Sequence, residues 1–300
     1  MSAMENLSLT ETAVTIPCAW QGDSFVTDAS ACRAAGEALA EEYRSNQPFP
    51  HIVIDDFLDP RVLDRVLSEF DAHRTYASQT FDRAQERFKT QFSPAESTSP
   101  FVRTFFAELN SANFLSFLEA MTGIKGLLPD PYFLGGGFHE TKRGGKLDVH
   151  ADFNIHKRLN LVRRLNLLIY LNKDWNPAYR GELELWNKSM TKREVSVAPL
   201  FNRAVVFNTD CDSMHGHPDP LNCPEDRARQ SVALYYYTSP EEGIASLMHR
   251  TTVFRARPGS TDKTDWQVRR DHFFSDWLPP VMNRARRKVI GKIRRLLHRA

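Results

Sequence analysis

The segment LDVHAD, residues 147–152, places His150 and Asp152 two positions apart. Side chains two apart on a β-strand point to the same face, so this imidazole and this carboxylate are predicted to lie side by side. Two histidines and one carboxylate on one face of an octahedral metal leave three positions open, which is the ligand set of non-haem Fe(II) sites. The segment therefore predicts two of the three ligands of such a site.

The third ligand has to come from a later strand. The segment SMHGHP, residues 213–218, supplies two candidates, His215 and His217, and the spacing alone does not choose between them. Farther along, Arg229 and Ser231 stand two apart at the start of an apolar run and are expected to share a face. A guanidinium pairs bidentately with a carboxylate and a hydroxyl adds a hydrogen bond, so this pair suits the distal carboxylate of 2-oxoglutarate.

Short apolar runs alternate with turn residues from Tyr132 to residue 238. This pattern predicts the strands of a β-sandwich or barrel. The expected strands are residues 132–137, 147–150, 164–171, 182–186, 194–197, 203–207 and 231–237, with turns that include Gly144-Gly145. An earlier β-branched run, HIVI at residues 51–54, predicts one more strand.

Helical periodicity of apolar residues predicts three helices before the strands. They span residues 30–44, 59–70 and 101–118, the second beginning at an Asp59 cap followed by Pro60. Residues 75–100 are polar and aperiodic and are predicted to form a long loop with a poor helix. Substrate contacts are expected from this loop and from residues 239–280, because loops on a rigid scaffold commonly carry specificity. The last twenty residues, 281–300, contain eight Lys or Arg and no acid, with an apolar stripe, which predicts a basic amphipathic helix.

Composition narrows the class of protein. The 300 residues include 39 Lys or Arg and 37 Asp or Glu, and 41% of them are hydrophobic. This near balance is typical of a folded chain and argues against a general nucleic-acid binder, so no nucleic-acid partner is expected. No apolar run is long enough to predict a transmembrane helix, and residues 1–13 lack the pattern of a signal peptide.

The four cysteines show no metal-binding or disulfide spacing. They stand far apart and form no CxxC pair, which predicts free thiols in a reducing compartment: Cys18, Cys32, Cys211 and Cys223. A cytoplasmic location is therefore expected.

These motifs together resemble those of the Fe(II)/2-oxoglutarate dioxygenases, in the prolyl 4-hydroxylase-like branch. FPHIVIDDFL (49–58) resembles the entry strand and helix of that branch, RLNLLIYLNKDW (164–175) the strand after its His-x-Asp motif, and RGELEL (180–185) the following strand. The resemblance implies an α+β fold with a double-stranded β-helix core, a cupin-like jelly roll, at residues 132–238. N-terminal helices would flank this core, and the basic helix would follow it at the C-terminus.

Three parts of the chain are expected. Residues 1–47 would form an N-terminal extension, residues 48–240 the dioxygenase domain, and residues 241–300 a C-terminal extension that holds the basic helix.

The resemblance also implies roles for individual residues. His150, Asp152 and His215 would bind Fe(II), because His215 stands in the family's position for the second histidine. His217 remains a possible replacement for His215. Arg229 would bind the distal carboxylate of 2-oxoglutarate.

Further contacts with 2-oxoglutarate are implied less directly. Ser231 stands beside Arg229, and Tyr170 matches a tyrosine that holds the same carboxylate in some members. The proximal carboxylate often meets a tyrosine about ten residues before the first histidine, and this chain has none there. His139 and Glu140 stand nearby instead, and His139 is the candidate for this contact.

The implied reaction is hydroxylation of a C–H bond in a prolyl residue or a small molecule, with O2 consumed and succinate and CO2 released. Ascorbate is a candidate bound reductant. A different substrate class is also compatible with the sequence: a lipid-linked or sugar metabolite, hydroxylated by a protein bound peripherally to the anionic inner face of a membrane through its basic helix. A non-catalytic 2-oxoglutarate sensor and a zinc hydrolase would use similar ligands, but the Arg-x-Ser pair would have no role in the hydrolase.

Overall fold

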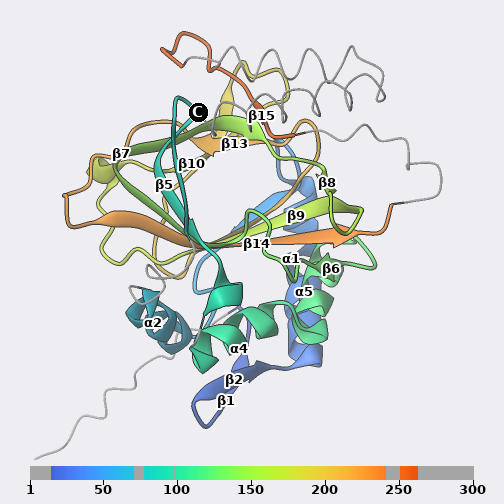
Figure 1. The fold of residues 1–300 in the computed structure, drawn as a ribbon. Helices are drawn as coiled ribbons and strands as arrows, with labels where there is room; N and C mark the ends of the chain where they lie inside the picture. The colour runs from blue at the N-terminus through green and yellow to red at the C-terminus, as the bar shows by residue number, and fades with distance from the viewer. Residues whose placement is uncertain (1–14, 71–77, 98, 241–250, 263–300) are drawn as a thin grey trace, which may run out of the picture.

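The computed structural model of the protein describes residues 15–70, 78–97, 99–240 and 251–262. The fold is α+β, with helices gathered along one side of a large antiparallel sheet system (Figure 1). These helices are α1 (Ala29–Ser45), α2 (Pro60–Ser68), α4 (Pro100–Leu109) and α5 (Ala112–Thr122). A separate hairpin of β1 (Cys18–Gln21) and β2 (Ser24–Thr27) precedes them.

The main sheet follows one path of paired strands. Its order is β11 (Arg193–Val197), β10 (Leu183–Trp186), β13 (Met214–His217), β7 (Gly137–Ala151), β14 (Ala228–Thr238), β9 (Leu161–Tyr170), β12 (Ala204–Asn208) and β3 (His51–Ile54). The first half of β7 pairs with β14 and the second half pairs with β13, so this one long strand belongs to both layers. The result is the nearly closed antiparallel jelly-roll core that the sequence predicts.

Two glycines allow β7 to pass from one layer to the other. Gly144 has φ +74°, a conformation that side chains with a Cβ rarely adopt. At Gly145 a Cβ would lie 2.7 Å from the carbonyl oxygens of Arg87 and Lys142. The sequence predicts a turn here that ends one strand before the next, whereas the pair bends a single continuous strand.

Side chains of the central strands alternate between two hydrophobic layers. Leu165, Leu167 and Ile169 of β9 join the large core formed with the helices. Tyr170 of β9 instead packs in a smaller core between the two sheets. The helices therefore cover the outer face of the β14–β9–β12 layer, and the inner face is left for the site.

The prediction of a long loop over residues 75–100 is wrong for residues 78–92. Residues 78–92 form a hairpin of β4 (Ser78–Arg83) and β5 (Glu86–Phe92), and β5 pairs with β7 along its free edge. The apolar–polar alternation that predicts a strand is missing here, because both faces of this hairpin carry polar side chains. One face lines a polar cavity and the other meets solvent.

Other predicted boundaries also differ. The helix expected over residues 101–118 is two helices. Asn110 caps the end of α4, and Ser111 caps the start of α5 by accepting a hydrogen bond from the Phe114 amide. Residues 132–136 form turns, and the strand expected there begins only at Gly137. The helix expected from Asp59 is confirmed, with the Asp59 carboxylate accepting from the Arg61 amide.

The remaining short elements are η1 (Pro94–Glu96), β6 (Leu128–Pro129), β8 (Ile155–His156), η2 (Pro177–Tyr179) and β15 (Val253–Phe254). The four cysteines are free thiols, as predicted. The basic helix expected at residues 281–300 lies outside the described residues. Within the described part of the chain, no helix is both long and apolar enough to cross a membrane.

Candidate functional site

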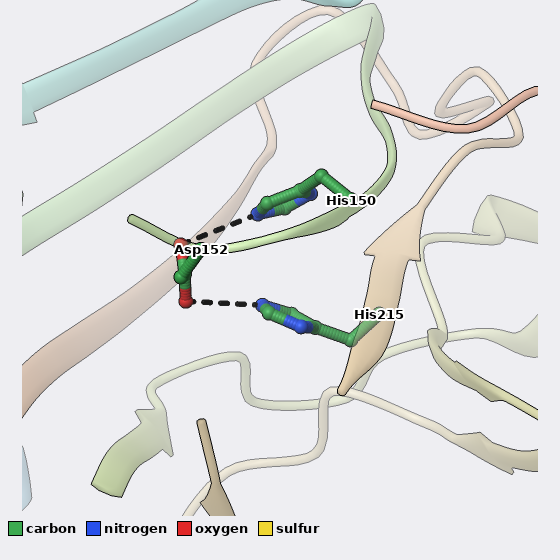
Figure 2. Close-up of side chains that lie close together, drawn as sticks. All are labelled: His150, Asp152 and His215. Atoms are coloured by element: carbon green, nitrogen blue, oxygen red, sulfur yellow. Dashed lines mark ion pairs between the residues drawn. The ribbon is translucent and has the colours of Figure 1, made fainter. Parts of the chain in front are cut away.

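Two neighbouring strands of the jelly roll bring the three predicted ligands together. His150 lies near the end of β7, and β13 places His215 directly opposite it in the antiparallel register. Asp152 follows β7 immediately. Its carboxylate oxygens lie 3.6 Å from His150 Nε2 and 3.5 Å from His215 Nε2 (Figure 2). One ligand atom of each residue falls within 4.8 Å of the others, so the three can hold one metal ion.

Backbone hydrogen bonds fix the orientation of both imidazoles. Nδ1 of His150 donates to the Asp148 carbonyl and Nδ1 of His215 donates to the Ser213 carbonyl, each at 2.8 Å. Because a carbonyl only accepts, each Nδ1 carries the proton and each Nε2 presents its lone pair toward Asp152. Burial, with His150 nearby, lowers the pKa of His215 to about 4, so its imidazole is neutral near pH 7.

Asp152 is held by a buried cation that was not predicted from the sequence. Arg163 Nη2 lies 3.0 Å from its Oδ2, and the Asn166 amide donates to the same oxygen at 2.8 Å. Burial would raise the pKa of Asp152, but Arg163 and the two histidines outweigh it and hold this pKa well below the ordinary value. The carboxylate is therefore ionised.

The guanidinium of Arg163 is itself tightly fixed. Its carbon lies 3.5 Å from the centre of the Tyr235 ring and 4.7 Å from that of Phe153, and two of its nitrogens donate to the Asn166 side-chain oxygen. A signal existed in the sequence, since Asn166 interrupts an apolar run of β9 on the same face as Leu168 and Tyr170.

Arg229 lies in the same cavity as the triad, on β14. Its Nε donates to the Gly181 carbonyl at 2.8 Å, and its Nη2 donates to the Tyr170 hydroxyl at 3.2 Å. Ser231, two residues further, also lines the cavity. Burial lowers the pKa of Arg229, although Tyr170 opposes this change. A buried guanidinium is stabilised by a nearby anion, so a carboxylate bound beside Arg229 would be favourable.

Gly181 makes room for this arginine. Its φ is +87°, and a Cβ there would lie 3.1 Å from Arg229 Cδ and 2.5 Å from Leu221. The Gly of the RGELEL segment is therefore required by the close approach of this backbone to Arg229.

His139 also lies on the cavity wall. Its Nε2 donates to the Gly135 carbonyl at 3.0 Å. Burial, with the Lys89 ammonium nearby, lowers its pKa to about 3, so the ring is neutral and its single proton is already engaged. The neighbouring Glu140 instead accepts from Gln230 at 3.2 Å.

The cavity has a volume of about 450 Å³. Besides the residues above, its wall includes charged side chains of the β4–β5 hairpin, Arg83, Glu86 and Lys89. Thr251, Thr252 and Phe254 close another side, and the Phe254 ring centre lies 5.4 Å from that of His150. They come from the segments 75–100 and 239–280, which were expected to supply substrate contacts, and pairing of β5 and β15 with β7 brings them to the cavity.

The cysteines near the third ligand play no part in the metal cluster. Among the described residues, the candidate metal-binding group consists of His150, Asp152 and His215 alone. Cys211 is exposed, while Cys223 is buried against Trp175 and Leu221.

Comparisons with known proteins agree with this geometry. Residues 136–237 match the family model of the 2OG-Fe(II) oxygenase superfamily, a range that contains the triad and Arg229. No curated protein matches the chain in sequence.

The chain is similar to several solved structures. A prolyl hydroxylase from Trichoplax adhaerens, solved with a peptide of hypoxia inducible factor, is 16% identical with a TM-score of 0.54, over 74% of this chain and 96% of that one. The non-heme alpha-ketoglutarate-dependent epimerase SnoN from nogalamycin biosynthesis is 15% identical with a TM-score of 0.50, over 77% and 93%. A Pseudomonas putida prolyl-4-hydroxylase is 15% identical with a TM-score of 0.48, over 68% and 98%.

The two imidazoles and the ionised carboxylate, whose ligand atoms all lie within 4.8 Å of one another, fit the Fe(II) ligand set of the matched family. Residues 136–237 are thus similar to the 2OG-Fe(II) oxygenase superfamily and carry an intact iron-binding triad of His150, Asp152 and His215.

Proposed function

We propose that this oxygenase hydroxylates a C–H bond of a prolyl residue or a small molecule, with 2-oxoglutarate and O2 consumed and succinate and CO2 released. The observation that carries the proposal is the complete triad of His150, Asp152 and His215. Asp152 bears on the type of reaction. Relatives that halogenate lack this carboxylate, which frees a position for chloride, so its presence favours hydroxylation.

Each residue has a defined task in this proposal. His150, Asp152 and His215 hold Fe(II), and the bound metal with 2-oxoglutarate supplies the O2 chemistry. Arg229 pairs with the distal carboxylate of 2-oxoglutarate, and Tyr170 and Ser231 add hydrogen bonds to it. The short Arg229–Tyr170 contact of 3.2 Å supports this role, because it fixes the guanidinium before the ligand arrives.

His139 is the remaining proposed contact, at the proximal carboxylate. For this role its Nε2 would have to exchange the Gly135 carbonyl for the ligand. A 2-oxoglutarate binding assay with two variants tests this contact. His139→Gln keeps a donor and should bind 2-oxoglutarate, whereas His139→Leu removes the donor and should bind it more weakly. Equal affinity in the two variants would contradict the contact.

A prolyl residue is the first substrate to test. The fold match to a prolyl hydroxylase in complex with a peptide supports it. The fold match to an epimerase from nogalamycin biosynthesis supports tests with small molecules as well. The cavity wall also contains Arg83, Glu86 and Lys89, which can contact polar groups of either.

The test is succinate formation by the full-length protein with Fe(II), 2-oxoglutarate and O2. Proline-containing peptides and free proline are supplied in turn, and products are examined by mass spectrometry for one added oxygen atom. We expect activity in the wild type and none in His150→Ala or Asp152→Ala. Iron-dependent 2-oxoglutarate binding without any succinate would favour a non-catalytic sensor, and dependence on ascorbate would support the proposed reductant.

A second candidate is hydroxylation of a lipid-linked or sugar metabolite at the inner membrane face. The eight basic residues and absence of acids at residues 281–300 favour it. Binding to anionic vesicles that is lost at high salt and on removal of these residues would support it. Equal recovery in the supernatant with and without vesicles at low salt would contradict it and favour a cytoplasmic protein free of the membrane.

A further inference from the structure

The β4–β5 hairpin brings two cations and one acid to the cavity that contains the triad. Phe81 and Arg83 stand two apart on β4 and so point to one face of it. Across the hairpin, Phe81 is opposite Lys89 and Arg83 is opposite Glu86. All four residues line the cavity, so the hairpin supplies a charged section of its wall.

These four side chains contact one another. One oxygen of Glu86 lies 3.3 Å from Lys89 Nζ, and the other lies 3.3 Å from Arg83 Nη2. Both cations also lie over the Phe81 ring, at 5.3 Å from its centre for Arg83 and 5.4 Å for Lys89, where the face of the ring attracts them. One carboxylate thus pairs with two cations, and the group has one positive charge in excess.

The Lys89 ammonium faces the interior of the cavity. Its side chain is only 12% exposed. After burial, the charge of Lys89 is the largest cause of the low pKa of His139, another residue of the wall. The charge of this lysine therefore acts on whatever fills the cavity.

Lys89 and Arg229 reach the cavity from separate strands. Lys89, Thr141 and Arg229 stand on one row of the adjacent strands β5, β7 and β14, so two strand spacings place their ends about 10 Å apart. Arg229 donates to Tyr170 of β9, on the side away from β5. Lys89 instead pairs with Glu86 at the hairpin. A cosubstrate held by Arg229 therefore leaves the hairpin available to a second ligand.

The charges of the whole cavity wall point to the nature of that ligand. Besides its histidines, the wall has four cations and two acids among the described residues: Arg83, Lys89, Arg163 and Arg229, with Glu86 and Asp152. Bound Fe(II) and the dianionic 2-oxoglutarate would offset each other, so the excess of two positive charges would remain. Opposite charges attract more strongly where water is partly excluded, so the cavity favours a substrate that brings negative charge.

We propose that Arg83 and Lys89 bind an anionic group of the prime substrate, a carboxylate or a phosphate. The inference rests on the proposed function and names the charge of the substrate that the site takes. The Arg83 guanidinium offers paired donors that match either anion, and the Lys89 ammonium adds a compact charge. The anion competes with Glu86 for both cations, and the Phe81 ring keeps them in place.

The test measures anion binding to the full-length protein saturated with Fe(II) and 2-oxoglutarate and kept free of O2. The cosubstrate already occupies its own site, so calorimetry detects a second anion separately. Two matched pairs of probes are titrated: N-acetylproline and N-acetylprolinamide for a carboxylate, and glycerol 3-phosphate and glycerol for a phosphate. The pair whose charged member binds more tightly than the neutral one identifies the source of the negative charge.

The variants have opposite expected effects. Lys89→Gln and Arg83→Gln each remove one cation and should raise the Kd of the charged probe about tenfold or more, as expected for the loss of a hydrogen bond between charged groups. Glu86→Gln removes the competing carboxylate and should lower that Kd, which a purely structural role of Glu86 would not do. The Kd for 2-oxoglutarate should stay nearly unchanged in all three variants.

Lys173→Gln is the matched control. Lys173 also pairs with an acid, at 2.6 Å from Asp64, and its ammonium also lies over an aromatic ring, at 5.0 Å from the centre of Phe201. It does not line the cavity. This variant should bind every probe as the wild type does.

The inference is overturned if neither charged probe binds more tightly than its neutral partner, or if Lys89→Gln and Arg83→Gln leave the Kd unchanged. An equal loss of affinity for 2-oxoglutarate in Lys89→Gln would also overturn it, because the lysine would then contact the cosubstrate. Wild-type protein that binds no 2-oxoglutarate contradicts the proposed function itself, which is a separate result. If Lys89→Gln does not fold, Glu86→Gln and Arg83→Gln carry the comparison, since the Arg83 side chain is 54% exposed.

Discussion

The two carboxylate oxygens of Asp152 are shared between the metal position and a fixed cation. Arg163 and Asn166 both contact Oδ2, at 3.0 and 2.8 Å, while Oδ1 faces His150. This arrangement keeps the carboxylate ionised and restricts its rotation. Residues that orient a metal ligand in this way affect metal affinity without touching the metal.

Replacing Arg163 by Gln should weaken iron binding about 10- to 100-fold, the usual effect of removing such a supporting contact. The Kd for iron, measured by competition with a chelator, checks this expectation. Arg65→Gln is the control, because Arg65 also pairs with an acid, Glu69 at 3.1 Å, and also lies over an aromatic ring, far from the site. Equal affinities in Arg163→Gln and wild type would contradict the role.

His139 links the stability of the metal-free protein to pH. Burial lowers its pKa to about 3, whereas the unfolded chain protonates histidine near the ordinary value of about 6.5. Above pH 6.5 neither state binds the proton. As the pH falls below 6.5, only the unfolded state binds it, so folding stability is lost progressively toward pH 3, by up to about 1.4 kcal/mol per pH unit.

His139→Gln should therefore lose less stability than the wild type on acidification. Between pH 7.5 and pH 5 the difference should be about 2 kcal/mol. Urea unfolding of the metal-free proteins at the two pH values measures it. Parallel losses in the two proteins would show that His139 is protonated equally in the folded and unfolded states.

At the scale of elements, the site depends on how closely β13 approaches β7. Gly216 lies between His215 and His217, and a Cβ there would lie 2.8 Å from the Leu147 carbonyl oxygen and 2.9 Å from that of Asp148. Both contacts are to backbone, so the strands would have to separate. The pairing that sets His215 opposite His150 therefore requires glycine at this position.

Gly216→Ala should weaken iron binding by at least about tenfold, because the two imidazoles no longer share one metal position. Chelator competition measures the loss. Gly22→Ala serves as a control for general destabilisation, since Gly22 has φ +60° in the β1–β2 turn, where alanine costs about 1 kcal/mol without meeting any atom. Iron affinity that survives in Gly216→Ala as it does in Gly22→Ala would mean that the strands do not separate.

At the scale of the whole molecule, the metal ligands join separate parts of the jelly roll. His150 and Asp152 come from β7, which belongs to both layers, and His215 comes from β13. A metal bound by all three would stabilise the folded state alone. At a free metal concentration of about 100 times Kd, this linkage amounts to about 2.7 kcal/mol.

Mn(II), which resists oxidation in air, should therefore raise the Tm of the wild type by several degrees, and 2-oxoglutarate should raise it further. Asp152→Ala should show neither increase. Thermal unfolding followed by circular dichroism provides the measurement, with Mg(II) as the salt control. The same increase in wild type and Asp152→Ala would place the stabilising metal elsewhere.

Several features of the fold and the site could be predicted from local sequence patterns. The two-residue spacing of His150 and Asp152 and of Arg229 and Ser231 fixes a shared face on any strand. Short apolar runs bounded by turn residues identify β9 and β14 as strands. The Asp59-Pro60 cap likewise marks a helix start through contacts within one turn. These features involve neighbours in sequence, which is why they were predicted correctly.

The β4–β5 hairpin could not be predicted in the same way. Its strands carry Arg83, Glu86 and Lys89. The pairing of β5 with β7 joins residues from Phe92 and Phe138 to Glu86 and Leu147, which stand far apart in the chain, and depends on a sheet edge that no local pattern reveals. The role of Arg163 could not be predicted for the same reason. A charged residue of this kind is usually exposed, and Phe153 and Tyr235 enclose its side chain only in the folded chain.

The ligand types, the strand-rich class and the order of motifs follow from the sequence alone, because residue chemistry and the two-residue period of strands are local properties. The spacing left His215 and His217 open, although the resemblance favoured His215. The tertiary structure decides between them, since the register of β13 against β7 brings only His215 to His150. The continuation of the LDVHAD strand through Gly144-Gly145 into both layers likewise emerges only in the folded chain. The distances that define a metal site exist only once strands far apart in the chain have paired.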